Sequence, residues 1–366
     1  MTDMTKKIDA AVLGCGKMGR TIIENIWDSP YLGEIIGYDI SEAALKETRD
    51  QYNVRTTTSL DEILQNEGIR LVYIAASNSA HVPLAIAAMR AGKAVMTEKP
   101  VGLTLPELEE LVAVQKETGA FLQVGLELRY SRLYLKAKEV IDSGRIGTPV
   151  SYHYTYSCSP YDADNWRVKR ENSGSMYHEK LCHYIDLVRW WNGSRVSEFI
   201  VTSAPNTLPH FEIEDNVHVT YRFENGAVSH LFFLMTAAPT GNSDMLQMKT
   251  DLFDQDKDGH KLNYVITGTK GAMEIDVFQR QLRVYRHAGD PQQTAATEEV
   301  TEVLAWDSGC DHEYFHNTQR QNLDILRRVA CGEPPYLPLE DAAETMRLCV
   351  EFSDAQRDHL WEVIRR

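Results

Sequence analysis

A glycine-rich turn near the start of the chain constrains its fold more than any other feature. Gly14, Gly16 and Gly19 follow the apolar run 10–13 and precede a helical pattern over 20–27. In a turn that binds pyrophosphate, the first glycine permits the tight bend and the second lets the backbone approach the phosphates. The third lets the helix pack closely on the strand, and the helix N-terminus offers free N–H groups to the anion. Because glycine also marks ordinary turns, this motif alone is weak evidence.

A carboxylate follows this turn at the distance that a dinucleotide site requires. The second apolar run ends in Asp39, twenty residues after Gly19. A carboxylate in this place accepts hydrogen bonds from the adenosine ribose and repels a 2′-phosphate. The order of strand, turn, helix, strand and acid therefore predicts a dinucleotide site that favours NAD over NADP, although Lys46 on the next predicted helix is a cation that can come close.

Length and composition exclude several classes of protein. A chain of 366 residues is too long for one ordinary core, so two domains are expected. The net charge of −15 argues against a nucleic-acid partner, which would require a basic face. No apolar run reaches the ~18 residues of a membrane span, and the N-terminus has no secretory signal. Six cysteines without a C-x-x-C spacing are typical of reduced thiols, so we expect a cytoplasmic protein.

Apolar runs divide the chain into two kinds of pattern. The first part alternates expected strands (8–13, 34–39, 71–75, 94–97, 121–124) with helical segments, as a doubly wound parallel sheet requires. After Pro149 a period-two pattern begins, and further strands are expected at 196–203, 215–222, 227–236, 262–267, 271–276 and 282–286, followed by helices at 312–331 and 339–361. We therefore predict an α/β Rossmann domain over 1–127. An α+β domain over 128–366 should carry a predominantly antiparallel open-faced sheet, with C-terminal helices that can pack back on the first domain.

Polar residues follow two of the predicted parallel strands directly. Ser77, Asn78 and His81 come after the strand 71–75, and Glu98 and Lys99 end the strand 94–97. Because ligands bind at the carboxyl ends of strands in open parallel sheets, both loops are expected to line the cofactor crevice. An alternative interpretation makes Lys99 a surface lysine that pairs with Glu98.

In combination, these motifs resemble the Gfo/Idh/MocA family of sugar and cyclitol oxidoreductases. The resemblance extends over nearly the whole chain, through Asn165-Trp166-Arg167, the stretch 174–186, Phe223-Glu224-Asn225-Gly226-Ala227, Ile266-x-Gly268-x-x-Gly271 and Gly332-Glu333-Pro334-Pro335. It implies an NAD-dependent dehydrogenase in which Lys99 is the family's lysine and His183 its acid/base histidine. It also implies a homo-oligomer, such as a dimer or tetramer formed through the second domain.

One position departs from the family pattern. The family usually carries aspartate four residues before the histidine, whereas this chain has Glu179, followed by Lys180. On a helix, residues 179, 183 and 186 share one face, so Glu179 can orient His183 and support its charged form. The alternative is a structural ion pair between Glu179 and Lys180.

The expected site residues follow from the motifs and from the resemblance. We expect Lys99, His183 and Glu179 to be catalytic, and Arg129, Tyr130, Tyr177, Lys180, Asp186 and His312 to bind the substrate. The residues expected to bind the cofactor are Gly14, Gly16, Lys17, Met18, Gly19, Asp39, Ser77, Asn78, His81, Glu98, Lys99, Trp166, Arg167 and Tyr336. The predicted reaction transfers a hydride between a secondary alcohol of a sugar, glycoside or cyclitol, for instance C3 of a glycoside, and the nicotinamide.

Two further functions remain open at this stage. Some relatives of this kind retain NAD and process glycosides without net redox change, and another is a non-catalytic regulator that senses nucleotide.

An acidic segment, 254–259, imitates a calcium loop but lacks its final glutamate, and no metal site is expected from Cys310, His312 and His316. Tyr152, Tyr154 and Tyr156 share one face of a predicted strand and are either core or a surface that stacks on a sugar or a neighbouring subunit.

Overall fold

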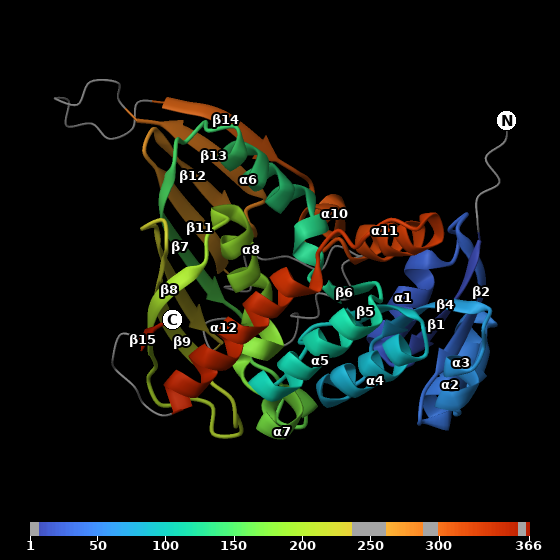
Figure 1. The fold of residues 1–366 in the computed structure, drawn as a ribbon. Helices are drawn as coiled ribbons and strands as arrows, with labels where there is room; N and C mark the ends of the chain where they lie inside the picture. Colours follow the sequence, from blue (N-terminus) through green and yellow to red (C-terminus); the bar gives the residue numbers. More distant parts are fainter. Residues whose placement is uncertain (1–6, 236–260, 288–298, 358–363) are drawn as a thin grey trace, which may run out of the picture. The chain divides into compact units, whose positions relative to one another are not determined.

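The computed structural model describes residues 7–235, 261–287, 299–357 and 364–366 (Figure 1). These residues form two compact units, each assembled from separate stretches of chain. Unit 1 comprises Met1–Glu127 and Thr318–Val350, and unit 2 comprises Leu128–Asn317 and Glu351–Arg366. No helix in the described stretches is both long enough and apolar enough to cross a membrane.

Unit 1 is built on a six-stranded parallel sheet. Its strands are β1 (Ile8–Leu13), β2 (Leu32–Tyr38), β3 (Arg55–Thr57), β4 (Ile69–Ile74), β5 (Ala94–Glu98) and β6 (Leu122–Gly125). They lie in the order β3-β2-β1-β4-β5-β6, and every pairing is parallel. The strand order reverses between β1 and β4, which is where ligands bind in sheets of this type. The predicted Rossmann sheet is confirmed.

Helices cover both faces of this sheet. They are α1 (Lys17–Ile26), α2 (Glu42–Tyr52), α3 (Leu60–Leu64), α4 (Asn78–Arg90), α5 (Leu105–Thr118), α11 (Thr318–Cys331) and the first part of α12 (Leu339–Arg357). In Figure 1, α11 lies above the sheet beside α1, whereas α4 and α5 lie below it. The start of α5 is fixed as its sequence predicts, because the Thr104 side chain accepts a hydrogen bond from the Glu107 N–H and Pro106 lies in the first turn.

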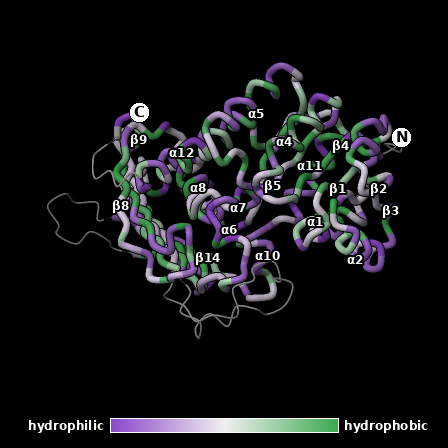
Figure 2. Tube along the Cα trace, turned by 90° about the horizontal axis from the view of Figure 1, so that it is seen from below, coloured by the Kyte–Doolittle hydropathy of each residue, from purple (hydrophilic) through white to green (hydrophobic). Residues whose placement is uncertain are grey.

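One hydrophobic core joins α11 to the strands of unit 1. Val12 and Tyr73 on the sheet pack with Ile22 of α1 and with Ile325 of α11, and all four side chains are buried. The Tyr73 hydroxyl donates a 2.8 Å hydrogen bond to the carbonyl of Asn322. Figure 2 shows hydrophobic residues concentrated along β1 and β4 and hydrophilic residues along the peripheral helix α2. A stretch near the C-terminus therefore completes the core of the N-terminal sheet.

Unit 2 contains a nine-stranded sheet. Its strands are β7 (Pro149–Ser157), β8 (Val196–Thr202), β9 (Asn216–Phe223), β10 (Val228–Leu234), β11 (Lys261–Gly268), β12 (Gly271–Asp276), β13 (Gln281–Arg286), β14 (Glu299–Ala305) and β15 (Ile364–Arg365). The order is β14-β13-β12-β11-β7-β10-β9-β8-β15, and all pairs except β7–β10 are antiparallel. The predicted, predominantly antiparallel sheet is confirmed.

Helices α6 (Arg132–Asp142) and α8 (Cys182–Asn192) lie against one face of this sheet (Figure 1). The three alternating tyrosines of β7 point toward that covered face and are at most 2% exposed. Tyr154 stacks on Tyr264 at 5.6 Å between ring centroids, and Tyr156 contacts Tyr184 of α8 edge-on at 4.9 Å. The interpretation of these tyrosines as a surface for a sugar or a second subunit is therefore wrong, because the helices bury the whole row.

The C-terminal helices differ from the prediction in one important place. The expected helix 312–331 is two helices, α10 (Asp311–Tyr314) and α11, separated by residues 315–317. The short strands β3, β14 and β15 were not predicted either. The calcium-like segment 254–259 lies outside the described residues.

Candidate active site

The turn between β1 and α1 has the shape that a pyrophosphate needs. Gly14 has a φ of +99°, and a Cβ there would lie 2.5 Å from the carbonyl oxygen of Ala75. A Cβ on Gly19 would lie 1.8 Å from the carbonyl oxygen of Gly14, so helix and strand touch. A Cβ on Gly16, the N-cap of α1, meets no atom within 4 Å. Two glycines thus close the turn while the third leaves open space at a helix N-terminus, which fits a dinucleotide phosphate.

Asp39 is joined to this turn by its own hydrogen bonds. Its Oδ2 accepts from the Cys15 N–H at 2.7 Å, and its Oδ1 accepts from the Ser41 N–H at 2.8 Å. The carboxylate is therefore held at the end of β2 beside the phosphate turn. The neighbouring Ile40 side chain is 86% exposed and uncharged. Lys46, the cation that could have favoured NADP, pairs with Asp50 one turn further along α2.

The loop after β4 is tied to the loop after β5 by a histidine. His81 is buried, and its Nδ1 lies 2.7 Å from the carbonyl oxygen of Pro100 while its Nε2 lies 3.1 Å from that of Ala76. Ser77 caps α4 without a side-chain hydrogen bond to the helix, and the Asn78 side chain is buried. His81 therefore braces the two loops that the sequence assigns to the cofactor.

The remaining unit 1 residues predicted to bind the cofactor lie at helix ends. Lys17 begins α1, and Met18 packs partly buried against the core of unit 1. The Tyr336 N–H donates to the Gln123 side chain at 2.9 Å, and the Arg328 guanidinium lies 5.8 Å from the Tyr336 ring centroid. Their roles toward the cofactor remain predictions.

Glu98 and Lys99 end β5 in contrasting environments. Burial, reinforced by the nearby Glu127 and opposed by Lys99, raises the pKa of Glu98 to about 8. A Cβ on Gly125 would lie 2.8 Å from Glu98 Oε2, so only glycine leaves room for this carboxyl group. Lys99 is half-buried and is joined to Pro100 by a cis peptide bond. Lys99 opposes this rise in the pKa of Glu98, and the catalytic role of Lys99 remains a prediction.

In unit 2, a buried ion pair fixes the helix that carries His183. His183 lies in the first turn of α8 and is 6% exposed. Three residues later, Asp186 accepts hydrogen bonds from Arg129 Nε and Nη2, both at 2.7 Å. Arg129 belongs to the 3₁₀ turn η1 (Glu127–Tyr130), where Tyr130 is also buried. Two side chains predicted to bind the substrate thus bind each other and hold α8 in place.

A π-helical turn, η3 (Tyr177–Leu181), precedes α8 and carries the residues that depart from the family pattern. Such turns are rare and often mark functional sites. Glu179 is 5% exposed and accepts a 2.7 Å hydrogen bond from Arg167 Nε. The Lys180 ammonium lies over the rings of Tyr156 and Tyr161, at 5.3 and 5.4 Å from their centroids. Glu179, for which an ion pair with Lys180 was the alternative to a catalytic role, thus pairs with Arg167.

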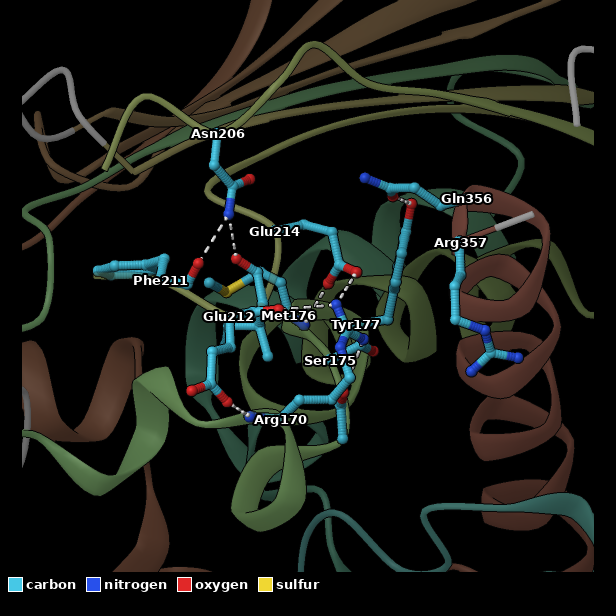
Figure 3. Close-up of polar contacts among 12 residues, drawn as sticks. Arg170, Ser175, Met176, Tyr177, Asn206, Phe211, Glu212, Glu214, Gln356 and Arg357 are labelled. Carbon is cyan, nitrogen blue, oxygen red and sulfur yellow. Dashed lines mark hydrogen bonds and ion pairs between the residues drawn. The ribbon is translucent and has the colours of Figure 1, made fainter. Parts of the chain in front are cut away.

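The start of η3 is held by polar contacts shown in Figure 3. Glu214 accepts hydrogen bonds from Arg170 at 2.9 Å and from the Met176 N–H at 3.1 Å. The Tyr177 hydroxyl bonds to Gln356 at 2.5 Å, and its ring packs edge-on against Phe352. Tyr177, which was predicted to bind substrate, is therefore part of the packing that anchors this turn.

His178 of the same turn is a buried neutral histidine. Its Nδ1 lies 2.7 Å from the Ser175 hydroxyl, and burial, with a smaller contribution from Arg170, lowers its pKa to about 4. The π turn therefore places a neutral imidazole directly before Glu179.

His316, which the sequence analysis considered only as a metal ligand, lies beside His183. The ring centroids of His183 and His316 are 5.9 Å apart and their planes are nearly perpendicular, at 89°. His312, the histidine expected in the substrate pocket, lies in α10 and is half-buried. Among the residues that the structure describes, no three His, Cys, Asp or Glu side chains gather as metal ligands do.

An aromatic and cationic segment leads into η3. Trp166 of η2 (Trp166–Val168) is 41% exposed, and the Arg167 guanidinium lies 4.7 Å from the Trp166 ring centroid. The Tyr161 ring stacks nearly parallel on Phe211, at 6.3 Å and 6°. Of these rings, Tyr161 lies beside the Lys180 ammonium, and Trp166 lies beside Arg167, the partner of Glu179.

The fold and the fitted phosphate turn define a Rossmann-type, dinucleotide-binding protein with a second open-faced sheet domain. The chain belongs to the Gfo/Idh/MocA oxidoreductase family. The family's NAD-binding Rossmann model matches residues 8–126, and its C-terminal domain model matches residues 134–274. Residues 8–126 are therefore the NAD-binding domain of an oxidoreductase.

Individual relatives are distant. The uncharacterized oxidoreductase YrbE of Bacillus subtilis is 29% identical over 62% of this chain and 67% of its own. The inositol 2-dehydrogenase of Salmonella typhimurium is 27% identical over 50% of this chain, and the match spans about half of that relative, 54%. Among solved structures, levoglucosan dehydrogenase in complex with NADH and levoglucosan has a TM-score of 0.77 at 19% identity, covering 98% of this chain and 99% of the other. This last likeness shows the fold.

Proposed function

We propose that this chain is an NAD-dependent dehydrogenase that oxidises a secondary alcohol of a sugar, glycoside or cyclitol, or reduces the corresponding ketone. The family membership and the names of its relatives, an inositol dehydrogenase and a levoglucosan dehydrogenase, support this substrate class. The observation that carries the proposal is the buried imidazole of His183 on a helix that the Arg129–Asp186 pair holds rigidly. A protein that only sensed nucleotide would have no use for that arrangement.

The proposed chemistry separates the proton from the hydride. Bound NAD supplies the acceptor for the hydride that leaves the carbinol carbon. His183 accepts the hydroxyl proton as general base, since imidazole titrates near neutral pH, and this contributes typically ~10²–10⁴-fold to the rate. The Lys99 ammonium binds the hydroxyl oxygen and stabilises the negative charge that develops there.

Glu179 has a supporting role in this proposal. A carboxylate one turn before His183 favours the charged imidazole that forms when the proton is taken up. The hydrogen bond from Arg167 orients the Glu179 carboxylate, which is 5% exposed. The longer glutamate, compared with the aspartate of the family pattern, is thus compensated by an arginine that fixes its carboxylate.

The exposed Trp166 ring supports a substrate larger than one sugar. An indole face binds the apolar face of a pyranose ring, and Trp166 is 41% exposed beside Arg167, in the segment before η3. A glycoside oxidised at C3 is a substrate of this size. Lys180, Tyr130 and His312 remain candidates for contacts with its hydroxyl groups.

The test is a dehydrogenase assay with variants on both units. NADH formation at 340 nm is followed with NAD and a panel of cyclitols, aldoses and glycosides. Lys99→Ala and His183→Ala should each lower kcat at least roughly 100-fold, while the dissociation constant of NAD changes less than about threefold. A wild-type protein that binds NAD but oxidises no alcohol would overturn the proposal.

A cofactor-retaining enzyme needs a different readout, because NADH does not accumulate. Stoichiometric enzyme is mixed rapidly with substrate, and a transient 340 nm absorbance that decays without NADH release indicates the redox-neutral alternative. Binding of nucleotide without any transient in the wild type favours the regulator. In both experiments the Lys99→Ala protein is the control.

The proposed preference for NAD over NADP rests on Asp39 and its neighbours. The double substitution Asp39→Ser with Ile40→Arg removes the repulsion of the 2′-phosphate and adds a cation. The ratio of kcat/KM for NADP to that for NAD should rise roughly 100-fold or more. An unchanged ratio would contradict the assignment of Asp39 to the ribose.

We also propose that the chain forms a homo-oligomer through the open face of the unit 2 sheet. Phe232, Val265, Val300 and Val303 are 38–53% exposed, and their strand registers place them on the face opposite the buried tyrosines. Exposed apolar side chains on an open sheet face support association, although the registers place Glu274 and Arg283 between Val265 and Val303. Phe232→Glu with Val265→Glu should reduce the mass measured by light scattering, whereas Trp27→Gln in unit 1 should not.

A further inference from the structure

His316 is the side chain near His183 that neither the sequence motifs nor the family pattern account for. It lies in the short break between α10 and α11, more than a hundred residues after His183. The two rings meet edge to face, with centroids 5.9 Å apart and an angle of 89° between their planes. Perpendicular rings at this distance are the favoured arrangement for an aromatic pair.

The backbone on both sides of His316 is held by one hydroxyl group. Ser131 Oγ donates to the carbonyl of Phe315 at 3.0 Å and accepts from the N–H of Asn317, also at 3.0 Å. The Ser131 side chain is completely buried, and the Asn317 side chain bonds back to the Glu313 carbonyl at 3.3 Å. His316 is therefore presented from a segment whose path is fixed before and after it.

The same short segment also holds the partner ring. Arg129, two residues before Ser131, makes the buried bidentate pair with Asp186, which lies three residues after His183 on α8. Residues 129–131 thus fix the helix of His183 with one side chain and the loop of His316 with another. Because one short segment holds both α8 and the loop of His316, it fixes the orientation of the two rings relative to each other.

We propose that His316 is a positioning residue for His183: its ring fixes the plane of the His183 imidazole and supports the positive charge that this imidazole acquires when it takes the substrate proton. The inference rests on the proposed function, in which His183 is the general base. The face of a neutral imidazole attracts the electron-poor edge of a charged neighbour. A cation in the place of the His316 ring would instead repel that charge.

The other side chains close to His183 and His316 lie on α8, on η3 and in the segment that carries His316. Tyr184 of α8 contacts His183 edge-on at 6.4 Å, and Asp186 on the same helix is engaged by Arg129. Glu179 lies on the preceding turn and is engaged by Arg167. The Phe315 ring contacts the His316 ring, with 4.5 Å between their centroids. Ser131 donates a hydrogen bond to the carbonyl of Phe315, the residue before His316. In these contacts, His316 is the titratable ring that reaches His183 from outside α8, from the segment between α10 and α11.

The first test uses nuclear magnetic resonance on the full chain with NAD bound. The ring nitrogens of histidine are labelled with ¹⁵N, and the His183 signals are assigned by their loss in His183→Gln. In His316→Ala and His316→Phe, the midpoint of the His183 titration should move by roughly half a pH unit or more relative to the wild type. Unchanged His183 titration and tautomer in both variants would overturn the proposal. The Phe variant keeps a ring of similar size, so it decides the question if the Ala variant fails to fold.

The second test is kinetic and separates positioning from packing. His316→Ala should lower kcat roughly 10- to 100-fold, because the base loses its orientation, while the KM for NAD stays unchanged. His316→Phe should recover part of kcat but keep an altered acidic limb in its pH profile. His287→Phe, directly after β13 in the same unit, is the matched control and should behave as wild type.

The two proposals fail in different ways. If the wild type oxidises no alcohol, the proposed function fails, but the resonance experiment still reports whether His316 controls the His183 ring. If turnover occurs and His316→Phe matches the wild type in kcat and pH profile, the inference about His316 fails while the function stands. A loss of kcat with an unchanged His183 titration would mean that His316 contacts the substrate itself, which also overturns it.

Discussion

The guanidinium of Arg129 and the carboxylate of Asp186 form a bidentate ion pair in which the two side chains are 5% and 1% exposed. The pair connects the first residues of unit 2, in η1, to α8, the helix that carries His183. Removing one partner of such a pair leaves a buried charge without compensation, which costs about 3–5 kcal/mol.

We therefore expect Asp186→Asn to lower the free energy of unfolding by about 3 kcal/mol or more, measured by urea denaturation. The same change at Asp142, which pairs with Lys138 on the exposed side of α6, should cost less than about 1 kcal/mol. Equal effects at the two positions would show that the Asp186 pair is not structurally important.

The three glycines of the phosphate turn should respond differently to alanine. Gly16→Ala adds a methyl group where no protein atom lies within 4 Å, so the fold should keep its stability within about 1 kcal/mol. The methyl group would still occupy the surface that the phosphates approach, and NAD affinity should fall at least roughly tenfold. Calorimetric titration with NAD measures the affinity.

Gly19→Ala provides the contrast, because its Cβ would lie 1.8 Å from a backbone oxygen. This variant should lose several kcal/mol of stability, about 3 or more, together with NAD binding. If Gly16→Ala unfolds as readily as Gly19→Ala, the assignment of open space above Gly16 is wrong.

Glu98 should make the protein less stable as the pH rises. Its pKa is raised to about 8 by burial and by Glu127, from an ordinary value of 4.5. The folded protein therefore retains a proton that the unfolded chain releases. The stabilisation that results is complete below pH 4.5 and is lost as the pH rises toward 8. Its size is on the order of 4 kcal/mol.

Glu98→Gln keeps the neutral shape and removes the titration. The difference in unfolding free energy between this variant and the wild type should grow in favour of the variant from pH 5 to pH 8. Denaturation curves at both pH values measure it, and a constant difference would show that Glu98 is ionised in the folded protein.

His178 should act in the opposite direction. Burial lowers its pKa from 6.5 to about 4, so between these values the unfolded chain binds a proton that the folded protein does not. Stability that is complete above pH 6.5 is lost as the pH falls toward 4, by on the order of 3 kcal/mol.

His178→Asn retains a group that can bond to Ser175 but does not titrate. The unfolding free energy of the wild type minus that of His178→Asn should decrease as the pH falls from 6.5 to 4.5. This difference is the quantity compared, because Glu98 titrates in both proteins over the same range and changes their stability in the opposite direction. Parallel curves would contradict a neutral buried His178.

The sequence predicted the elements whose signals are local. Strands β1, β4 and β5 are buried apolar runs, and the glycine turn has fixed spacing, so the parallel sheet of unit 1 and the shape of this turn could be predicted from the sequence. The roles of the residues expected to bind the cofactor remain predictions. β3 was missed because it has only three residues, Arg55–Thr57, which are exposed or half-buried and therefore carry no apolar pattern.

The remaining differences come from contacts between distant segments. The helical periodicity continues through residues 312–331, yet the helix breaks because the backbone at Phe315 and Asn317 bonds to Ser131 instead. The pairing of Arg129 with Asp186 joins residues 57 positions apart. No local pattern distinguishes such a pair from two side chains that bind a sugar, so both were assigned to the substrate.

Unit 1 is completed by α11, whose Ile325 fills the sheet core and whose Asn322 carbonyl accepts from Tyr73. All of residues 128–317 must be synthesised before that helix leaves the ribosome. The nucleotide-binding unit, whose first strand is made at the very beginning of translation, therefore cannot complete its core until a segment near the other end of the chain has been made.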